Sequence, residues 1–239
     1  MKKPGVVRRD TSLELVLEYI RNAILDGTFP PGTQLKQSVI ASDLGVSQGP
    51  TREALIQLVS EGLVENIPFH GMFVRELTCK DVEEIYQLRQ GLESLAVKIA
   101  LPILKKPEHS ARLEQLIQET IQAEEMGEYE QAVAKDLAFH RYLVETSGNE
   151  RLINFWNSLL AQARVILRKL YQVEREVFHE SMAQNHRIIL EAIKIQDYEA
   201  IENVLQEHMD YARTRLLRLI QTEDKLEAGE QVVESIDYA

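Results

Sequence analysis

Hydrophobic residues recur every three or four positions along most of the chain, the spacing that places them on one face of a helix. In the first third, turns containing Gly and Pro interrupt this spacing, and two short apolar stretches flank the sequence PFHG. We therefore expect three helices and a β-hairpin, the order of a winged helix-turn-helix. The helices are predicted from Thr11 to about residue 25, over 37–44 and from Ser47 to about Glu61, and the strands over 63–67 and 72–77.

The rest of the chain has a helical pattern throughout, which predicts an all-α bundle and a mainly α protein. Thr78 and Asp81 have the spacing of a capping box at the start of its first helix. The predicted organisation is a DNA-binding domain over 1–77, an all-α effector-binding and dimerisation domain over 78–221, and an acidic, partly disordered tail over 222–239. The six predicted helices cover 79–101, 108–126, 129–146, 149–173, 176–195 and 198–221.

The net charge of −11 is unevenly distributed along the chain, and its distribution indicates which part could bind DNA. Residues 1–78 contain 8 Lys/Arg and 9 Asp/Glu, whereas the remaining residues contain 19 and 29. The acidity belongs to the helical domain, so the N-terminal domain remains compatible with DNA binding. Cys79 is the only cysteine, and neither a signal peptide nor a run of ~18–20 apolar residues is visible. We expect a soluble, cytoplasmic protein that associates with the nucleoid and not with a membrane.

The segment LGVSQGPTREALIQLVSEGLVENIPFHGMFV, residues 44–74, resembles the GntR family of bacterial transcription regulators. The resemblance rests on FPPGTQL, on LGVS followed by Pro and REAL, on EGLVE, and on the wing sequence HG-x-F-V, in this order. The helical remainder looks like the FCD branch (the FadR C-terminal domain) in its six-helix, VanR-like form. The resemblance implies a sequence-specific regulator, most often a repressor, that binds double-stranded operator DNA as a homodimer and responds to a small carboxylate effector.

The third helix of such a domain points its N-terminus into the major groove, near phosphates and base edges. Arg52 can offer a bidentate fork to guanine, unless it pairs with Glu53 or Asp43 on the protein surface. Family members often carry arginine at the positions of Ser38 and Gln48. Because this chain has neither, we expect an altered base preference and a shallow salt dependence. The candidate DNA contacts are Lys36, Ser47, Gln48, Gly49, Thr51, Arg52, His70 and Gly71.

Two pairs of polar residues fall on predicted apolar faces of the helical domain. Asp136 and His140 are one turn apart on the inward stripe of one helix, where an isolated carboxylate would be costly to bury. His186 and His208 lie ten residues before and eleven after the turn at 196–197, so at ~1.5 Å per residue both are about 15 Å from it. The four side chains should converge. They can form a buried hydrogen-bonded core or a His₃Asp metal site.

The family resemblance favours the metal site. Many FCD regulators bind a divalent ion through an Asp-x-x-x-His pair on one helix and a histidine on each of two later helices. The ligand types suit Zn, Ni, Fe or Mn, and a six-coordinate ion would keep two positions for water or an effector carboxylate. His109 and His179 are not expected to take part. The ligands that the resemblance implies are Asp136, His140, His186 and His208.

The resemblance also makes Arg89 the main effector contact, because the first FCD helix commonly carries an arginine that faces the ligand. The alternative is an (i, i+4) ion pair between Arg89 and Glu93. Weaker effector candidates are Asn185 and Arg164. Two other functions are compatible with such a site: a helical metalloenzyme that activates water, and a sensor for which the metal is itself the signal. We expect no enzyme, because no evident general base accompanies the ligands.

Overall fold

The computed structural model describes residues 9–177 and 183–227 and divides into two compact units, Met1–Glu76 and Leu77–Ala239. The first unit is a winged helix-turn-helix and the second a bundle of helices, so the predicted mainly α fold class is confirmed. The division falls one residue before the boundary expected from the sequence.

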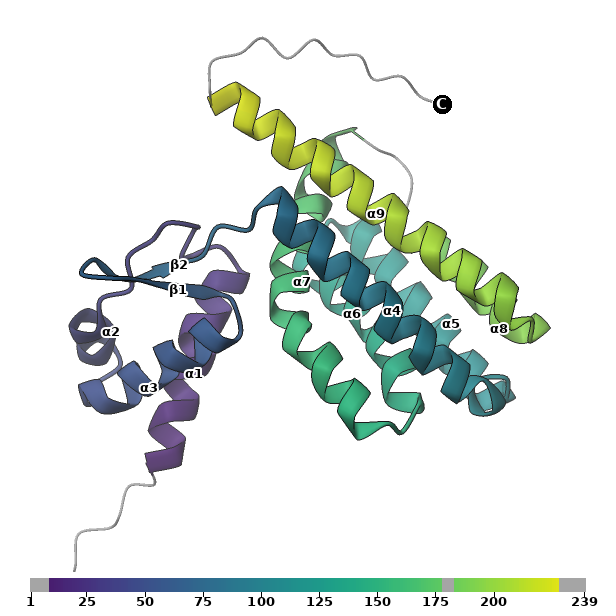
Figure 1. The fold of residues 1–239 in the computed structure, drawn as a ribbon, viewed down its shortest axis with the longest axis horizontal. Coiled ribbons are helices and arrows are strands. Elements are labelled where there is room, and N and C mark those ends of the chain that lie inside the picture. The colour runs from purple at the N-terminus through teal and green to yellow at the C-terminus, as the bar shows by residue number, and fades with distance from the viewer. Residues whose placement is uncertain (1–8, 178–182, 228–239) are drawn as a thin grey trace, which may run out of the picture. The chain divides into compact units, whose positions relative to one another are not determined.

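The first unit contains three helices followed by a two-stranded antiparallel hairpin, which is the wing (Figure 1). The wing strands pair in a register that sets Ile67 opposite Gly71, and Gln34 forms an isolated bridge to Phe73. The first helix begins two residues earlier than predicted. The elements are α1 (Arg9–Leu25), α2 (Gln37–Asp43), α3 (Gln48–Ser60), β1 (Val64–Ile67) and β2 (Gly71–Val74).

The helices of the first unit bury their apolar faces against one another. Val16 and Ile20 of α1 and Leu55 of α3 are completely buried. Arg21 of α1 donates to both carboxylate oxygens of Glu61, with distances of 3.0 and 2.6 Å, at the end of α3. This bidentate pair joins the first and third helices, so α3 is held by both apolar packing and charge-assisted hydrogen bonds.

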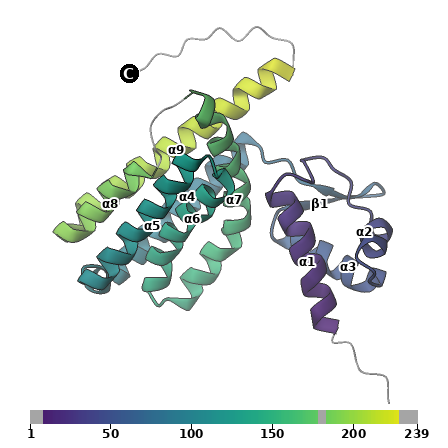
Figure 2. The ribbon, with the colours of Figure 1, turned by 180° about the vertical axis from the view of Figure 1, so that it is seen from behind.

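Within the described residues the second unit contains six helices and no strand (Figure 1, Figure 2). Four predicted boundaries in this unit were wrong by three residues or more. α4 ends at Leu104 rather than at 101, and α7 ends at Val177 rather than at 173. α8 begins at Gln184 rather than at 176, and α9 continues to Glu227, so residues 222–227, assigned to the tail, are helical. Residues 178–182 and 228–239 lie outside the described residues. The helices are α4 (Cys79–Leu104), α5 (Pro107–Met126), α6 (Tyr129–Thr146), α7 (Glu150–Val177), α8 (Gln184–Ile195) and α9 (Tyr198–Glu227).

Helix α4 is central to the bundle, because it packs against α6, α7 and α9. The predicted capping box at its start is confirmed: the Thr78 side chain accepts from the backbone of Asp81, whose side chain accepts from the backbone of Thr78. α8 and α9 pack as a hairpin. At its turn Gln196 has a left-handed φ of 65°, and Oδ1 of Asp197 accepts from the backbone N–H of Ala200. As a result α4, α6, α8 and α9 all contribute side chains to one buried polar cluster.

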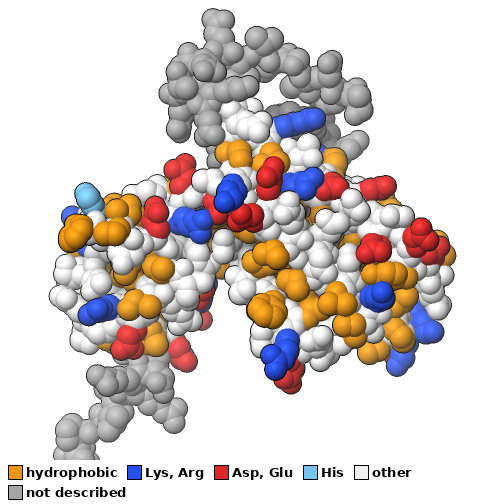
Figure 3. Space-filling model, in the orientation of Figure 1, with side chains coloured by type: hydrophobic (Ala, Val, Ile, Leu, Met, Phe, Trp, Pro, Cys, Tyr) orange, Lys and Arg blue, Asp and Glu red, His pale blue; other side chains and the backbone are white. Residues whose placement is uncertain are grey.

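Part of the bundle surface is apolar. Figure 3 shows hydrophobic side chains gathered over α4 and α7. Those on α4 recur along one edge of the helix and form a stripe. None of the described helices is long and apolar enough to cross a bilayer. We call this stripe, together with an exposed residue of α7, the α4–α7 face, because α7 packs against α4. Its residues are Leu88, Leu95, Ile99 and Ile103, which are 39–54% exposed, and Phe155, which is 66% exposed.

Candidate metal centre and DNA-binding surface

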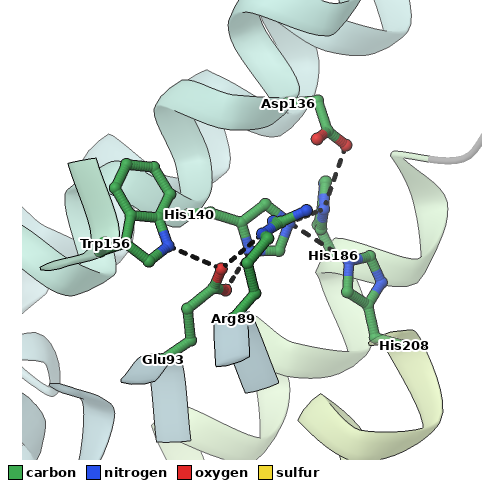
Figure 4. A network of polar contacts seen from close by, with 7 residues as sticks. All are labelled: Arg89, Glu93, Asp136, His140, Trp156, His186 and His208. Atoms are coloured by element: carbon green, nitrogen blue, oxygen red, sulfur yellow. Dashed lines mark hydrogen bonds and ion pairs between the residues drawn. The ribbon is translucent and has the colours of Figure 1, made fainter. Parts of the chain in front are cut away.

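Three buried histidines from three helices converge in the second unit (Figure 4). His140 lies on α6, His186 on α8 and His208 on α9. Nε2 of His140 is 3.1 Å from Nε2 of His186 and 3.2 Å from Nε2 of His208. The α8–α9 turn explains this convergence, because His186 and His208 lie at similar distances from it on antiparallel helices.

The spacing of these nitrogens suits a single metal ion. Metal–imidazole bonds of about 2.0–2.1 Å, at angles between roughly 90° and 109°, place two ligand nitrogens about 2.9–3.4 Å apart. Both measured separations fall in this range. Nδ1 of His186 and Nδ1 of His208 are buried without a hydrogen-bond partner among the described residues, so these two rings take part in the cluster through Nε2. The approach of three Nε2 atoms to one another fits a bound divalent ion.

Asp136 approaches the histidines from one side. Its carboxyl group is 3% exposed, and Oδ1 lies 3.5 Å from Nε2 of His186 (Figure 4). The compact set, with all ligand atoms within 4.8 Å of one another, consists of the three histidines. The structure thus brings the four residues of the expected His₃Asp set together, with Asp136 beside the compact set, whereas metal binding stays a prediction.

Glu93 of α4 was not assigned to this site from the sequence. Its Oε2 lies 2.6 Å from Nδ1 of His140, 47 residues further along the chain. Burial raises the pKa of Glu93, but the charges of His140 and Arg89 outweigh burial and lower this pKa to about 2. An ionised carboxylate only accepts hydrogen bonds, so Nδ1 of His140 donates, and Nε2 of the same ring faces the other two histidines. Pairs of this kind orient histidines that bind metals.

Arg89 forms the ion pair that the sequence offered as the alternative to an effector contact. Its Nε donates to Oε1 of Glu93 at 3.1 Å, and the same oxygen accepts from Nε1 of Trp156 at 2.9 Å. Burial lowers the pKa of Arg89, but the charge of Glu93 leaves it raised overall. Nη2 of Arg89 is buried without a hydrogen-bond partner among the described residues. The guanidinium is therefore paired with Glu93 and still has a donor for a second anion.

The surroundings keep two of the histidines in the form that binds metals. Burial, followed by the charges of His208 and His140, lowers the pKa of His186 well below 6.5. Burial and the charge of His140 lower the pKa of His208 to about 3. Phe139 stacks on the His186 ring with a centroid distance of 4.3 Å, which fixes the plane of that ring. Neutral, oriented imidazoles can bind an ion without first releasing a proton.

Within the described residues, the surroundings of the two weaker effector candidates, Asn185 and Arg164, do not connect them with the histidine cluster. Asn185 is half-buried next to His186 on α8. Arg164 of α7 is 34% exposed, and its Nη2 lies 3.7 Å from Oε2 of Glu130 on α6. Nδ1 of His109 lies 2.7 Å from the hydroxyl of Tyr142, which agrees with leaving His109 out of the site. His179 lies outside the described residues.

Seven of the eight candidate DNA contacts are exposed in the first unit. Ser47 is the N-cap of α3 but makes no side-chain capping bond, so its hydroxyl and the first amides of the helix are available to a phosphate. Within the described part of the chain Arg52 forms no ion pair, so the alternative of pairing with Glu53 or Asp43 is not realised. The exposed candidates are Lys36, Ser47, Gln48, Gly49, Arg52, His70 and Gly71.

Thr51 is the exception, and its expected DNA contact was wrong. The side chain is completely buried, on the same face of α3 as Ala54, Leu55 and Leu58. Thr51 packs inside the winged helix, and its hydroxyl cannot reach a phosphate or a base edge.

Comparison with known proteins identifies the family. Residues 14–74 match the profile described as "Bacterial regulatory proteins, gntR family", and residues 84–211 match that of the FCD domain. The chain belongs to the GntR family. It carries the DNA-binding domain of that family followed by an FCD domain, and it is a DNA-binding transcriptional regulator.

The relatives of this GntR regulator match it over most of their length. A Paenarthrobacter nicotinovorans protein named "Probable D-xylose utilization operon transcriptional repressor" is 30% identical over 84% of this chain and 87% of its own. The gluconate operon transcriptional repressor of Bacillus subtilis is 27% identical over 88% of this chain and 87% of its own. The structure of E. coli McbR/YncC has a TM-score of 0.70 and 27% identity, and covers 89% of this chain and 98% of that one. These relatives are regulators and not enzymes, which sets aside the metalloenzyme alternative.

Proposed function

We propose that this GntR regulator binds its operator under the control of a small organic acid held at a divalent metal ion. His140, His186 and His208 would coordinate the ion, with Asp136 as a fourth ligand. The observation that carries the proposal is the pair of Nε2 separations of 3.1 and 3.2 Å between three buried histidines. Zn, Ni, Fe and Mn all accept these ligands. The ion would act as a Lewis acid that binds the effector carboxylate.

The charges around the histidines favour an anionic effector only when the ion is bound. Glu93 and an ionised Asp136 carry two negative charges, and Arg89 carries one positive charge. The metal-free cluster therefore has one negative charge in excess, which repels a carboxylate. A divalent ion changes this to one positive charge in excess, which attracts it. Nη2 of Arg89 would donate to the bound carboxylate in a charge-assisted hydrogen bond.

The names of the relatives support repression and a small carboxylate effector. Two of them are named as repressors, of a D-xylose utilization operon and of a gluconate operon. Gluconate is a carboxylate with hydroxyl groups, a chemistry that an open metal site and an arginine donor would bind. We infer that the effector of this protein is a small organic acid and that its binding relieves repression.

Metal analysis of the full-length protein, purified without chelators, tests this proposal. We expect about one Zn, Ni, Fe or Mn per chain, as in three-histidine protein sites. His186→Ala should abolish metal binding. The matched control His109→Ala should keep it, because His109 contacts Tyr142 and not the cluster.

The metal-loaded protein is then titrated with gluconate, citrate, succinate and acetate while operator binding is followed by fluorescence anisotropy. We expect one acid to change the operator affinity about 5–150-fold, the usual range of allosteric coupling. A wild-type protein that binds no metal would contradict the proposal. A change in operator affinity caused by the ion alone would make the ion itself the signal.

We also infer that the protein is a homodimer that joins two copies through the α4–α7 face. A pseudo-palindromic operator requires two recognition helices, one for each half-site. Contiguous exposed apolar surface on a single chain usually marks an interaction site. Leu88 and Ile103 are at opposite ends of the α4 stripe, so the stripe extends along much of the helix. A two-fold axis across α4 would bury the stripe of each copy against that of the other.

A further inference from the structure

The tip of the wing has an apolar side chain with no contact that explains it. Phe69 is 107% exposed, whereas the next most exposed large apolar residue among those described, Ile195, is 73% exposed. Its neighbours in the turn, Pro68 and His70, are exposed as well. Folding of the winged helix therefore does not require a phenyl ring at this position.

The backbone at Phe69 is also unfavourable for a bulky residue. Phe69 has a φ of 66°, in the left-handed region that glycine and asparagine adopt more readily. The turn is held in this shape from both sides. Nδ1 of His70 donates to the carbonyl of Pro68 at 2.9 Å, and Nε2 of Gln34 donates to the carbonyl of His70 at 2.8 Å. A strained residue that its surroundings over-determine often marks a functional position.

The wing has no positive charge with which to hold DNA. Between Arg52 and Arg75 the sequence contains no Lys or Arg, and Glu65 on β1 is exposed. Phosphate neutralisation and counterion release, the usual sources of affinity for the DNA backbone, are therefore not open to the wing. Its tip can contribute to DNA binding by apolar contact and by shape.

We propose that Phe69 enters the minor groove of the operator and wedges its ring against a base step. In both views of the fold the β1–β2 turn, α2 and the start of α3 lie at the same end of the first unit (Figure 1, Figure 2). A DNA duplex that receives α3 in its major groove then meets the turn at a neighbouring minor groove. Apolar side chains that enter minor grooves partly unstack a step and bend the duplex.

This contact gives Phe69 a role in sequence selection. Pyrimidine–purine steps such as TA and CA unstack and kink more readily than other steps. An operator with such a step under each wing should bind more tightly, although the phenyl ring forms no hydrogen bond with a base. The inference rests on the DNA binding of the family and not on the metal site, so failure of the metal proposal would leave it standing.

The test uses an operator selected from random duplexes with the full-length protein, with the wing located by hydroxyl-radical footprinting. Phe69→Gly relieves the left-handed backbone, so we expect it to unfold at the same or a higher urea concentration. It should nevertheless bind the operator roughly tenfold more weakly, the usual effect of losing an aromatic contact with bases. The slope of log affinity against log salt should stay unchanged, because no phosphate contact is lost.

Three further measurements separate this role from others. Phe69→Leu should restore most of the affinity, because leucine is also an effective wedge. Leu15→Ala, which shortens another exposed apolar side chain of the same unit, should change nothing. The wild type should prefer a TA over an AA step under the wing, and Phe69→Gly should lose that preference. The proposal is overturned if Phe69→Gly keeps the wild-type affinity, if it keeps the step preference, or if it changes the oligomeric mass while operator affinity stays the same.

Discussion

A single carboxylate, that of Glu93, connects the candidate metal ligands with two other helices. Its Oε2 accepts from His140 on α6, and its Oε1 accepts from Arg89 on α4 and from Trp156 on α7. All of these groups are almost completely buried. A buried charge is tolerated only with its full set of partners, so a change at Glu93 should be transmitted directly to His140.

We expect Glu93→Gln to weaken metal binding about 10- to 100-fold, the usual effect of losing the partner of a metal-binding histidine. Glutamine has one accepting oxygen, so its amide NH₂ must face either His140 or the donors of Arg89 and Trp156. Competition with a chromogenic chelator measures the affinity, with circular dichroism to verify folding. Glu84→Gln, at an exposed position of the same helix, is the control. Equal affinities of wild type and Glu93→Gln would show that Glu93 does not orient His140.

Gly49 offers a separate prediction at the residue scale, on the DNA side. A Cβ added there would lie 4.0 Å from Oγ of Ser47, which is ordinary contact, so folding does not require glycine at this position. Gly49→Ala should therefore leave the protein folded, because the gain in helix propensity is offset by the crowding of a Cβ directly before Pro50. If the backbone approaches DNA here, the methyl group should lower operator affinity. The control, Gln57→Ala further along α3, should leave operator affinity unchanged. If Gly49→Ala also binds the operator as tightly as the wild type, Gly49 does not lie in the DNA interface.

At the scale of elements, local patterns predicted most helices and the convergence of His186 with His208. Both histidines lie on one hairpin, so counting residues from its turn was sufficient. The burial of Thr51 was also visible, since Thr51, Ala54, Leu55 and Leu58 are spaced as one helical face, but a hydroxyl near a helix N-terminus suggested a phosphate contact instead.

The role of Glu93 was not visible at the element scale. Arg89 lies one turn from Glu93 on the same helix, so an ion pair between them was enough to account for the carboxylate. The other partner, His140, is 47 residues further along the chain and is brought close by the packing of α4 on α6. Contacts of this kind depend on how helices dock, which the pattern of a single helix does not contain. Sequence patterns therefore predicted that the candidate ligands converge, but not that Glu93 contacts one of them.

The α4–α7 face gives a prediction at the same scale. Leu95→Glu combined with Ile99→Glu places two charges of equal sign where each copy would meet the other. We expect the chain mass of 27.4 kDa in light scattering, in place of twice that mass for the wild type. Operator affinity should fall as well, because one chain holds one half-site. Ile195→Glu, at an exposed position of α8, should leave the mass unchanged, and a dimeric double variant would place the interface elsewhere.

For the whole molecule, the charge distribution limits how DNA can be held. The chain has a net charge of −11, and the described candidate contacts include two cationic side chains, Lys36 and Arg52. Few phosphates are then neutralised by each copy, and affinity should depend less on salt than in regulators rich in arginine. More of the binding free energy must come from base contacts, the wing and the shape of the operator.

Restoring the absent arginines tests this directly. Ser38 and Gln48 are exposed on α2 and α3, so Ser38→Arg combined with Gln48→Arg should be accommodated. Each new phosphate contact should steepen the slope of log affinity against log salt by about 0.9, or about 3.6 for four contacts in a dimer. The slopes are compared on one operator between roughly 50 and 300 mM salt, a range over which each phosphate contact changes the affinity about fivefold. Identical slopes would mean that neither position is near a phosphate.

Trp156 is the only tryptophan in the sequence, and it lies one hydrogen bond from the carboxylate that holds His140. Its emission should therefore report whether the candidate metal centre is occupied, without an added dye. Loading metal-depleted protein with Ni²⁺ should quench the fluorescence, and a chelator should restore it. Trp156→Phe should remove the signal. An effector that binds the ion would disturb the same indole, so libraries of organic acids can be screened optically with the unlabelled protein.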